Sequence, residues 1–268
     1  MKLAVPKETA SGETRVAATP ESIKKFKGLG LDTVVETGAG AAARIADADF
    51  VAAGASIAPD ARTALSDADI VLKVRGPSAA ESALIKKGAV VAALLAPHTE
   101  KAAIATLGAQ GATAFAMEFL PRISRAQAMD VLSSQANLAG YKAVIDAAAQ
   151  FGRAMPMMMT AAGTIAPARV LVMGVGVAGL QAIATAKRLG AIVSATDVRP
   201  ATKEQVESLG GTFVAVMDEE FKNAQTAGGY AKEMSAEYQA KQAARNRTSS
   251  SPPRSFLAAR RPCWCRKP

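Results

Sequence analysis

Short apolar runs alternate with amphipathic stretches along most of the chain. Each run is a few residues long and rich in Val, Ile, Leu and Ala, and most are followed by polar turns and helically spaced apolar positions. Regular alternation of strand and helix predicts an α/β fold with parallel sheets. The predicted strands cover residues 3–5, 33–36, 70–74, 90–94, 113–116, 169–173, 192–196 and 212–216.

Capping residues mark several helix boundaries. Thr19 precedes Pro20, which is the order expected of an N-cap and a first helical proline, and this helix is expected to end near Gly28. Another helix is expected to start at Thr99. In the second half, residues 177–189 predict a helix closed by a glycine.

A long helical stretch, from about residue 125 to residue 151, divides the chain. We therefore predict two Rossmann-like parallel-sheet domains joined by a long helix, the second domain being truncated. The methionine-rich segment 155–160 is interpreted as a loop that fills a core or an interface. The predicted regions are an N-terminal α/β domain (1–125), a linking helix (126–152), a second, incomplete Rossmann domain (153–245) and a basic tail (246–268).

The second domain carries a glycine-rich turn between a predicted strand and a predicted helix. Gly174 permits a tight turn, Gly176 lets the backbone approach a pyrophosphate, and Gly179 permits close helix–strand packing. Amide groups at the helix start attract phosphates. The alternative is a structural glycine turn in an unrelated α/β protein, but the strand, helix and second strand all stand where a dinucleotide site needs them. The turn comprises Gly174, Val175, Gly176, Val177, Ala178 and Gly179.

The next predicted strand leads to Asp197, where an acidic residue is expected to receive a cofactor ribose. Its carboxylate can accept hydrogen bonds from the ribose hydroxyls and would repel a 2′-phosphate, so we predict NAD(H) over NADP(H). Arg199 complicates this preference, because a nearby arginine can host a 2′-phosphate, but Asp197 is expected to dominate. The predicted cofactor-binding residues are Gly174, Gly176, Val177, Ala178, Gly179, Asp197, Val198 and Arg199.

Composition sets limits on the remaining chemistry. The 268-residue chain is 50% hydrophobic and 4% aromatic, so small aliphatic residues build its core. The net charge of +9 falls to +2 without the seven basic residues of 245–268, and therefore does not indicate nucleic-acid binding. Both cysteines lie in the tail and His98 is the single histidine, so we expect no metal site.

Two further features bear on where the protein is expected to reside. No apolar run reaches the length of about 20 residues that a membrane-spanning helix needs. The first eight residues are too charged for the start of a secretory signal. We therefore expect a soluble protein of the cytoplasm.

Several segments beyond the glycine turn carry a shared pattern. Residues 121–130 read P-R-I-S-R-A-Q-A-M-D, residues 132–141 read L-S-S-Q-A-N-L-A-G-Y, and residues 228–234 read G-G-Y-A-K-E-M. Together with 170–199 and with P-K-E and E-T-R-V near the N-terminus, they resemble the NAD(H)-binding component of proton-translocating nicotinamide nucleotide transhydrogenase, alpha subunit. The resemblance covers about residues 1–244 and is more specific than the glycine motif.

The resemblance implies a mechanism. Such a component binds NAD(H) and passes a hydride directly to NADP(H) on a separate component, so catalysis consists of positioning two nicotinamide rings. It implies that Arg122 contacts the carboxamide or a pyrophosphate oxygen and that Asp130 holds Arg122. Gln127 would sit between the two cofactors, with Ser133 in the same polar cluster, and Tyr230 would lie on a loop that closes over the nucleotide. Taken without the resemblance, the charges at 122–130 fit a solvated helix end.

The resemblance also implies partners. It implies a homodimer that docks on membrane-embedded transhydrogenase subunits and on the NADP(H)-binding component. The protein would then be cytoplasmic and peripheral to the inner membrane. The Si/Re-specific, proton-translocating reaction would require those partner subunits.

The N-terminal half also resembles alanine dehydrogenase. In that family an arginine, a lysine and a histidine hold the substrate carboxylate and assist proton transfer, and Arg15, Lys73 and His98 are the matching residues. Oxidation of an amine requires an acid–base group, and a histidine suits this by its pKa. His98 could equally be a helix-start residue. The polar cluster at 122–133 favours the transhydrogenase.

The tail departs from the family pattern. Transhydrogenases continue with a strand like D-I-V-I-T-T-A-L-I-P-G-R, whereas residues 246–258 read N-R-T-S-S-S-P-P-R-S-F-L-A. Permitted codons for the observed residues, read from the third base of the Asn246 codon, give P-D-I-V-I-T-T-A-L-I-P-G-R. We hypothesise that the tail is a frameshifted translation, which leaves a parallel sheet edge uncovered. An inactive truncated copy is therefore a third alternative.

Overall fold

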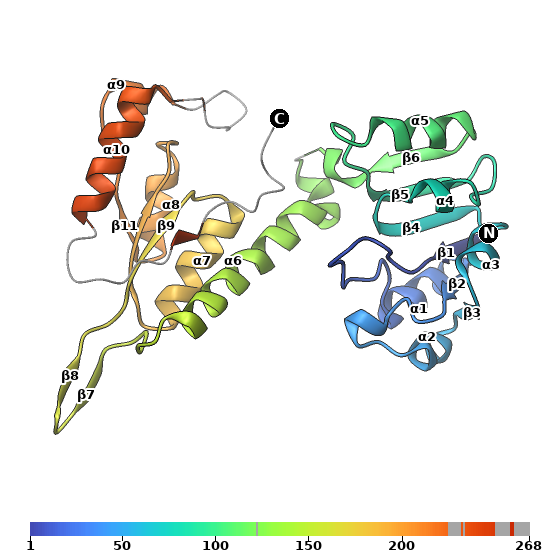
Figure 1. The fold of residues 1–268 in the computed structure, drawn as a ribbon, viewed down its shortest axis with the longest axis horizontal. Coiled ribbons are helices and arrows are strands. Elements are labelled where there is room, and N and C mark those ends of the chain that lie inside the picture. The colour runs from blue at the N-terminus through green and yellow to red at the C-terminus, as the bar shows by residue number, and fades with distance from the viewer. Residues whose placement is uncertain (122, 225–231, 233, 250–257, 260–268) are drawn as a thin grey trace. The chain divides into compact units, whose positions relative to one another are not determined.

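The computed structural model describes residues 1–121, 123–224, 232, 234–249 and 258–259. The chain forms two compact units, residues 1–131 and 132–268, and each contains a parallel sheet with helices packed on it (Figure 1). The prediction of an α/β fold with two parallel-sheet domains is thereby confirmed.

The predicted linking helix begins later than expected. Residues Ser124–Met129 form a 3-10 helix (η3), and Asp130 leaves the helical region with ψ 87°. The α-helix α6 runs over Val131–Gln150. The prediction of one helix from residue 125 was therefore wrong in its first turn, because sequence periodicity does not distinguish a 3-10 turn from an α-helical one.

Unit 1 is built on a six-stranded parallel sheet with the order β3-β2-β1-β4-β5-β6. Leu3 and Val5 belong to the core on one face with Phe50, while Ala4 belongs to the core on the other face with Leu107. The strands are β1 Lys2–Val5, β2 Asp32–Glu36, β3 Ser56–Ala58, β4 Ile70–Arg75, β5 Val90–Leu94 and β6 Thr113–Ala116. The helices are α1 Pro20–Gly28, η1 Ala41–Ala43, α2 Asp47–Ala53, α3 Ala61–Leu65, α4 Ala79–Ser82, α5 Lys101–Ala109 and η2 Met117–Phe119.

The order of strands in unit 1 defines a crevice position. The chain moves outward from β1 through β2 to β3, and then continues on the other side of β1 with β4. At such a switch point the loops after neighbouring strands diverge, and ligand sites form there at the carboxyl ends of the strands.

Unit 2 holds a second parallel sheet with the order β11-β10-β9-β12. Val170, Val172 and Val193 from its strands pack with Ile183 and Val206 from its helices. The strands are β9 Arg169–Met173, β10 Ile192–Thr196, β11 Thr212–Phe213 and β12 Ala258–Ala259. The remaining helices are α7 Val177–Arg188, α8 Thr202–Ser208, α9 Glu219–Lys222 and α10 Ala236–Ser249.

The methionine-rich segment is a hairpin and not a loop. Strand β7 (Met158–Thr160) pairs antiparallel with β8 (Gly163–Ile165), and the hairpin extends away from the body of unit 2 (Figure 1). Met159 is 70% exposed and Ile165 is 49% exposed. The hairpin residues therefore do not fill the core of this unit.

The tail contributes two described residues to the sheet. Ala258 and Ala259 lie parallel to β9, opposite Leu171 and Val172. We expected no strand in the tail and an uncovered sheet edge, and this was wrong for these two residues. Backbone pairing uses groups that every residue carries, so a short pairing needs no side-chain pattern. The Cys263–Cys265 segment lies outside the described residues.

Candidate functional site

The glycine turn connects β9 to α7 as predicted. Gly174 adopts φ +96°, which favours glycine, and its amide donates to the carbonyl of Thr196 over 2.8 Å. A Cβ on Gly179 would lie 1.9 Å from the carbonyl oxygen of Gly174. The fold itself therefore requires glycine at both positions.

Gly176 differs from its neighbours in the turn. Its backbone has φ −87° and ψ −165°, which other residues adopt readily, and no described atom lies within 4 Å of the position of a Cβ. The fold alone gives no reason for glycine here. A dinucleotide pyrophosphate that approaches the backbone does give one, so the turn fits the predicted cofactor.

The start of α7 offers donors to such a phosphate. Gly176 is its N-cap, and among the described residues no side chain caps this helix. The amides of the first turn, around Val177 and Ala178, are therefore available to phosphate oxygens.

Helix α6 supports the first turn of α7 from behind. A Cβ on Gly140 would lie 2.1 Å from the carbonyl oxygen of Ala178, so only glycine allows this approach. Asn137 also donates from Nδ2 to Oε1 of Gln181 over 3.3 Å. The sequence analysis missed Gly140, and its only signal is a glycine in a helix interior, where glycine is unfavourable without a packing reason.

Asp197 follows β10 and reaches back to the glycine turn. Its Oδ2 accepts from the amide of Val175 over 2.7 Å, and Arg199 donates to both carboxylate oxygens from Nε and Nη2, each over 2.9 Å. Burial raises the pKa of Asp197, but these hydrogen bonds outweigh it and hold the pKa below its ordinary value. The structure brings Asp197, Arg199 and the turn together, with Val198 between them in the chain.

The polar cluster implied by the resemblance is only partly described. Gln127 is exposed in η3, while Asp130 and Ser133 are half-buried at the break before α6 and in its first turn. Arg122 and Tyr230 lie outside the described residues. The role of these residues at a nicotinamide therefore stays a prediction.

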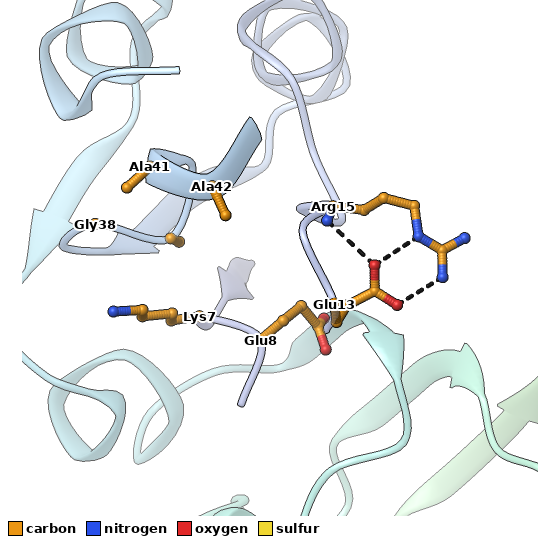
Figure 2. A pocket seen from close by; sticks show the side chains of 8 residues that line it. Lys7, Glu8, Glu13, Arg15, Gly38, Ala41 and Ala42 are labelled. Atoms are coloured by element: carbon orange, nitrogen blue, oxygen red, sulfur yellow. Dashed lines mark hydrogen bonds and ion pairs between the residues drawn. The ribbon is translucent and has the colours of Figure 1, made fainter. Parts of the chain in front are cut away.

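Unit 1 contains a cavity of about 170 Å³. Figure 2 shows the carboxylate of Glu13 facing the guanidinium of Arg15, with the side chains of Lys7 and Glu8 beside them. Arg15 donates to Glu13 from Nε over 2.7 Å and from Nη2 over 2.6 Å. The cavity is lined by Lys7, Glu8, Glu13, Arg15, Gly38, Ala39, Ala41 and Ala42.

Lys73 is buried behind this cavity, at the switch point of the sheet. Its Nζ lies 2.7 Å from Oε1 of Glu81 and 3.7 Å from Oε2 of Glu8, and all three side chains are under 10% exposed. His98 is exposed and meets the ring of Phe119 edge-on at 5.5 Å between centroids. The lysine that could hold a substrate carboxylate is thus already paired, as is the arginine in the cavity wall.

Glu13 gives the cavity wall a predictable pH dependence. Hydrogen bonds from Arg15 lower the pKa of Glu13 to about 2. A depressed folded pKa means that the ionised carboxylate stabilises the fold above its ordinary pKa, and that this stabilisation is lost as the pH falls towards 2. We therefore expect Glu13→Gln to melt below the unaltered chain at pH 7, and the gap to narrow from pH 5 downwards.

Thermal melts at a series of pH values test this. Glu21→Gln is the control, because that carboxylate is exposed on α1 and its only described ion pair is with Lys25 on the same helix. A gap between Glu13→Gln and the unaltered chain that stays constant down to pH 2 would contradict the role assigned to the pair.

Comparison with known proteins places this architecture. Residues 4–139 match the alanine dehydrogenase/PNT N-terminal domain, and residues 143–246 match the alanine dehydrogenase/PNT C-terminal domain. The chain belongs to the alanine dehydrogenase/PNT family. In Rhodospirillum rubrum, the first of the proteins that make up NAD(P) transhydrogenase subunit alpha is 62% identical over 248 residues, which are 91% of this chain and 65% of that protein. The chain therefore spans about two thirds of the length of that relative.

Within the alanine dehydrogenase/PNT family, the chain is more similar to transhydrogenase alpha subunits than to alanine dehydrogenases. Alanine dehydrogenase of Mycobacterium tuberculosis is 33% identical over 207 residues, 74% of this chain and 54% of that protein. The crystal structure of transhydrogenase from Sinorhizobium meliloti has a TM-score of 0.82 and 53% identity, covering 93% of this chain and 66% of that one. An L-alanine dehydrogenase has a TM-score of 0.70 and 29% identity, covering 80% and 60%.

Two other features of this family member were searched among the described residues alone. No group of three or more His, Cys, Asp or Glu side chains there is arranged to hold a metal ion. In the same residues, no helix is both long enough and apolar enough to cross a membrane.

Proposed function

We propose that this chain is the NAD(H)-binding component of a proton-translocating transhydrogenase alpha subunit, which exchanges a hydride with NADP(H) on a partner component. One observation carries the proposal. Gly176 stands with open space at its Cβ position below the uncapped start of α7, in a chain 62% identical to a transhydrogenase subunit. Open backbone at a helix start suits a pyrophosphate, and the fold gives no other reason for this glycine.

The chain's own residues would bind and orient the cofactor. The amides of the glycine turn would hold the pyrophosphate, and Asp197 would accept from the adenosine ribose. Arg122, Gln127, Asp130 and Ser133 would position the nicotinamide, with Tyr230 closing over the nucleotide. The bound nicotinamide supplies the hydride chemistry, so no side chain has to move a proton.

An amino-acid dehydrogenase activity receives less support. A carboxylate substrate in unit 1 would need cationic side chains free to bind it. Arg15 is held by Glu13, and Lys73 is held by Glu81. The proposed substrate of this chain is accordingly a nicotinamide nucleotide and not an amino acid.

The partners follow from the proposed reaction. We propose a homodimer that docks on the NADP(H)-binding component and on membrane-embedded subunits, on the cytoplasmic side of the inner membrane. The exposed hairpin is the surface that best fits contact between two copies, because soluble proteins rarely expose clustered large apolar side chains without a partner. Its exposed members are Met157, Met158, Met159 and Ile165.

The hairpin contact gives a direct prediction. We expect Met159→Asp to weaken the homodimer by at least about tenfold, because a charge would be buried in an apolar contact. Sedimentation equilibrium measures this. Met217→Asp is the matched control, since Met217 is 55% exposed in the same unit but outside the hairpin. Equal dissociation constants for the two variants would contradict the hairpin interface.

Nucleotide binding tests the proposed function itself. Purified full chain is titrated with NADH and with NADPH, alongside a thermal melt, and NADH oxidation is assayed with pyruvate and ammonia. We expect NADH to bind more tightly than NADPH, with no turnover of pyruvate. Turnover of pyruvate would favour the amino-acid dehydrogenase. A folded chain that binds neither nucleotide would favour an inactive copy.

A further inference from the structure

The carboxylate of Asp197 has no acceptor position left over. A carboxylate has about four acceptor positions. Oδ1 accepts from the amide of Arg199 and from its Nε, each over 2.9 Å. Oδ2 accepts from the amide of Val175 over 2.7 Å and from Nη2 of Arg199 over 2.9 Å. A ribose can therefore bind to Asp197 only in place of one of these donors.

Two of the four donors are fixed by the fold. The amide of Val175 belongs to the glycine turn, and the amide of Arg199 belongs to the backbone that leads to α8. The other two belong to one flexible guanidinium whose side chain is 20% exposed. The guanidinium of Arg199 is thus the donor that a ligand can replace without moving the backbone.

The guanidinium also matches the ligand it would yield to. Nε and Nη2 of Arg199 present two parallel donors, one to each oxygen of Asp197. The vicinal 2′- and 3′-hydroxyls of a ribose are likewise two neighbouring donors. We propose that Arg199 occupies the ribose position on Asp197, that NAD(H) binds by displacing it, and that the displaced guanidinium governs tolerance of a 2′-phosphate. This inference rests on the proposed NAD(H) function of the turn.

Displacement has a consequence for cofactor choice. Nη2 of Arg199 also donates to the carbonyl of Val175 over 2.9 Å, so the guanidinium lies between Asp197 and the turn. After displacement it remains tethered within reach of the ribose, and it stays charged at every accessible pH. A 2′-phosphate would meet the repulsion of Asp197 and the attraction of Arg199 together. Arg199 therefore competes against NAD(H) and assists NADP(H).

Binding measurements on the full chain test this. We expect Arg199→Met to bind NADH about fivefold more tightly than the unaltered chain and NADPH about fivefold more weakly. ADP carries the diol and 2′,3′-dideoxy-ADP lacks it, so the gain should appear with ADP and vanish with the dideoxy compound. Arg188→Met is the control for the loss of one positive charge, because Arg188 is exposed at the end of α7.

A second variant covers a loss of stability. Arg199→Lys keeps the charge but cannot donate in a fork, so its gain for NADH and ADP should be intermediate and equally confined to ligands with the diol. Unchanged or weaker NADH binding in both variants, or an equal gain for dideoxy-ADP, would overturn the inference alone. An unaltered chain that binds neither NADH nor ADP would overturn the proposed function and this inference with it.

Discussion

Gly179→Ala is expected to abolish NADH binding and to lower the free energy of unfolding by about 3 kcal/mol. The new methyl group would lie 1.9 Å from the carbonyl oxygen of Gly174, which is backbone and cannot rotate away. Either α7 moves off β9 or the turn opens, and both changes remove amides from the phosphate position. Urea denaturation and NADH fluorescence titration measure the two effects.

Gly176→Ala is the matched control for that substitution. Its backbone conformation suits alanine and its Cβ position is open among the described atoms, so stability should be unchanged or raised by up to about 1 kcal/mol. NADH binding should nevertheless weaken, because the methyl group would enter the pyrophosphate space. Gly176→Ala with normal NADH affinity would contradict the placement of the pyrophosphate on this turn.

Lys73→Met is expected to lower the free energy of unfolding by about 3–5 kcal/mol, because it removes the cation from a buried ion-pair cluster. The carboxylates of Glu8 and Glu81 would remain, with side chains 3% and 7% exposed. Glu8 is held by the amide of Val74 over 2.6 Å, and Glu81 caps α4 through the amide of Ser78 over 2.7 Å. Neither can therefore turn to solvent without breaking backbone contacts.

A double variant isolates the charge effect. Glu81→Gln keeps the capping hydrogen bond to Ser78 and removes one negative charge. We expect Lys73→Met with Glu81→Gln to be more stable than Lys73→Met alone when urea denaturation is compared. A Lys73→Met chain with unaltered stability would show that the pair is not buried as described, and would reopen a carboxylate-binding role for Lys73.

The elements of the fold that follow from sequence are those with strong local signals. Strand β9, with Val170 and Val172 buried, reads as an apolar run, and Thr19 caps α1 by accepting from the amide of Ser22 over 3.3 Å. The elements from α2 to α4 were missed, because each has only a few residues in alanine-rich sequence and none completes two helical turns. The hairpin β7–β8 was missed because its turn, Ala161-Ala162, lacks the usual glycine or asparagine signal.

The site was predictable where spacing alone defines it. Gly174, Gly176, Gly179 and Asp197 follow from a local motif and the strand after it. The fork of Arg199 on Asp197 did not follow, because an arginine so placed can face either a ligand or its neighbour. The contact of Gly140 with α7 and the pairing of Lys73 with Glu8 depend on tertiary packing of distant segments, which periodicity does not encode.

Hydride transfer in a reconstituted mixture tests the central claim most directly. The full chain is combined with an NADP(H)-binding transhydrogenase component, NADPH, and an NAD analogue whose reduced form absorbs at a distinct wavelength. The account predicts that the analogue is reduced only when both proteins are present, and that Gly176→Ala slows the reaction. A chain that folds and binds NADH, yet turns over pyruvate and ammonia and transfers no hydride from NADPH, would contradict it.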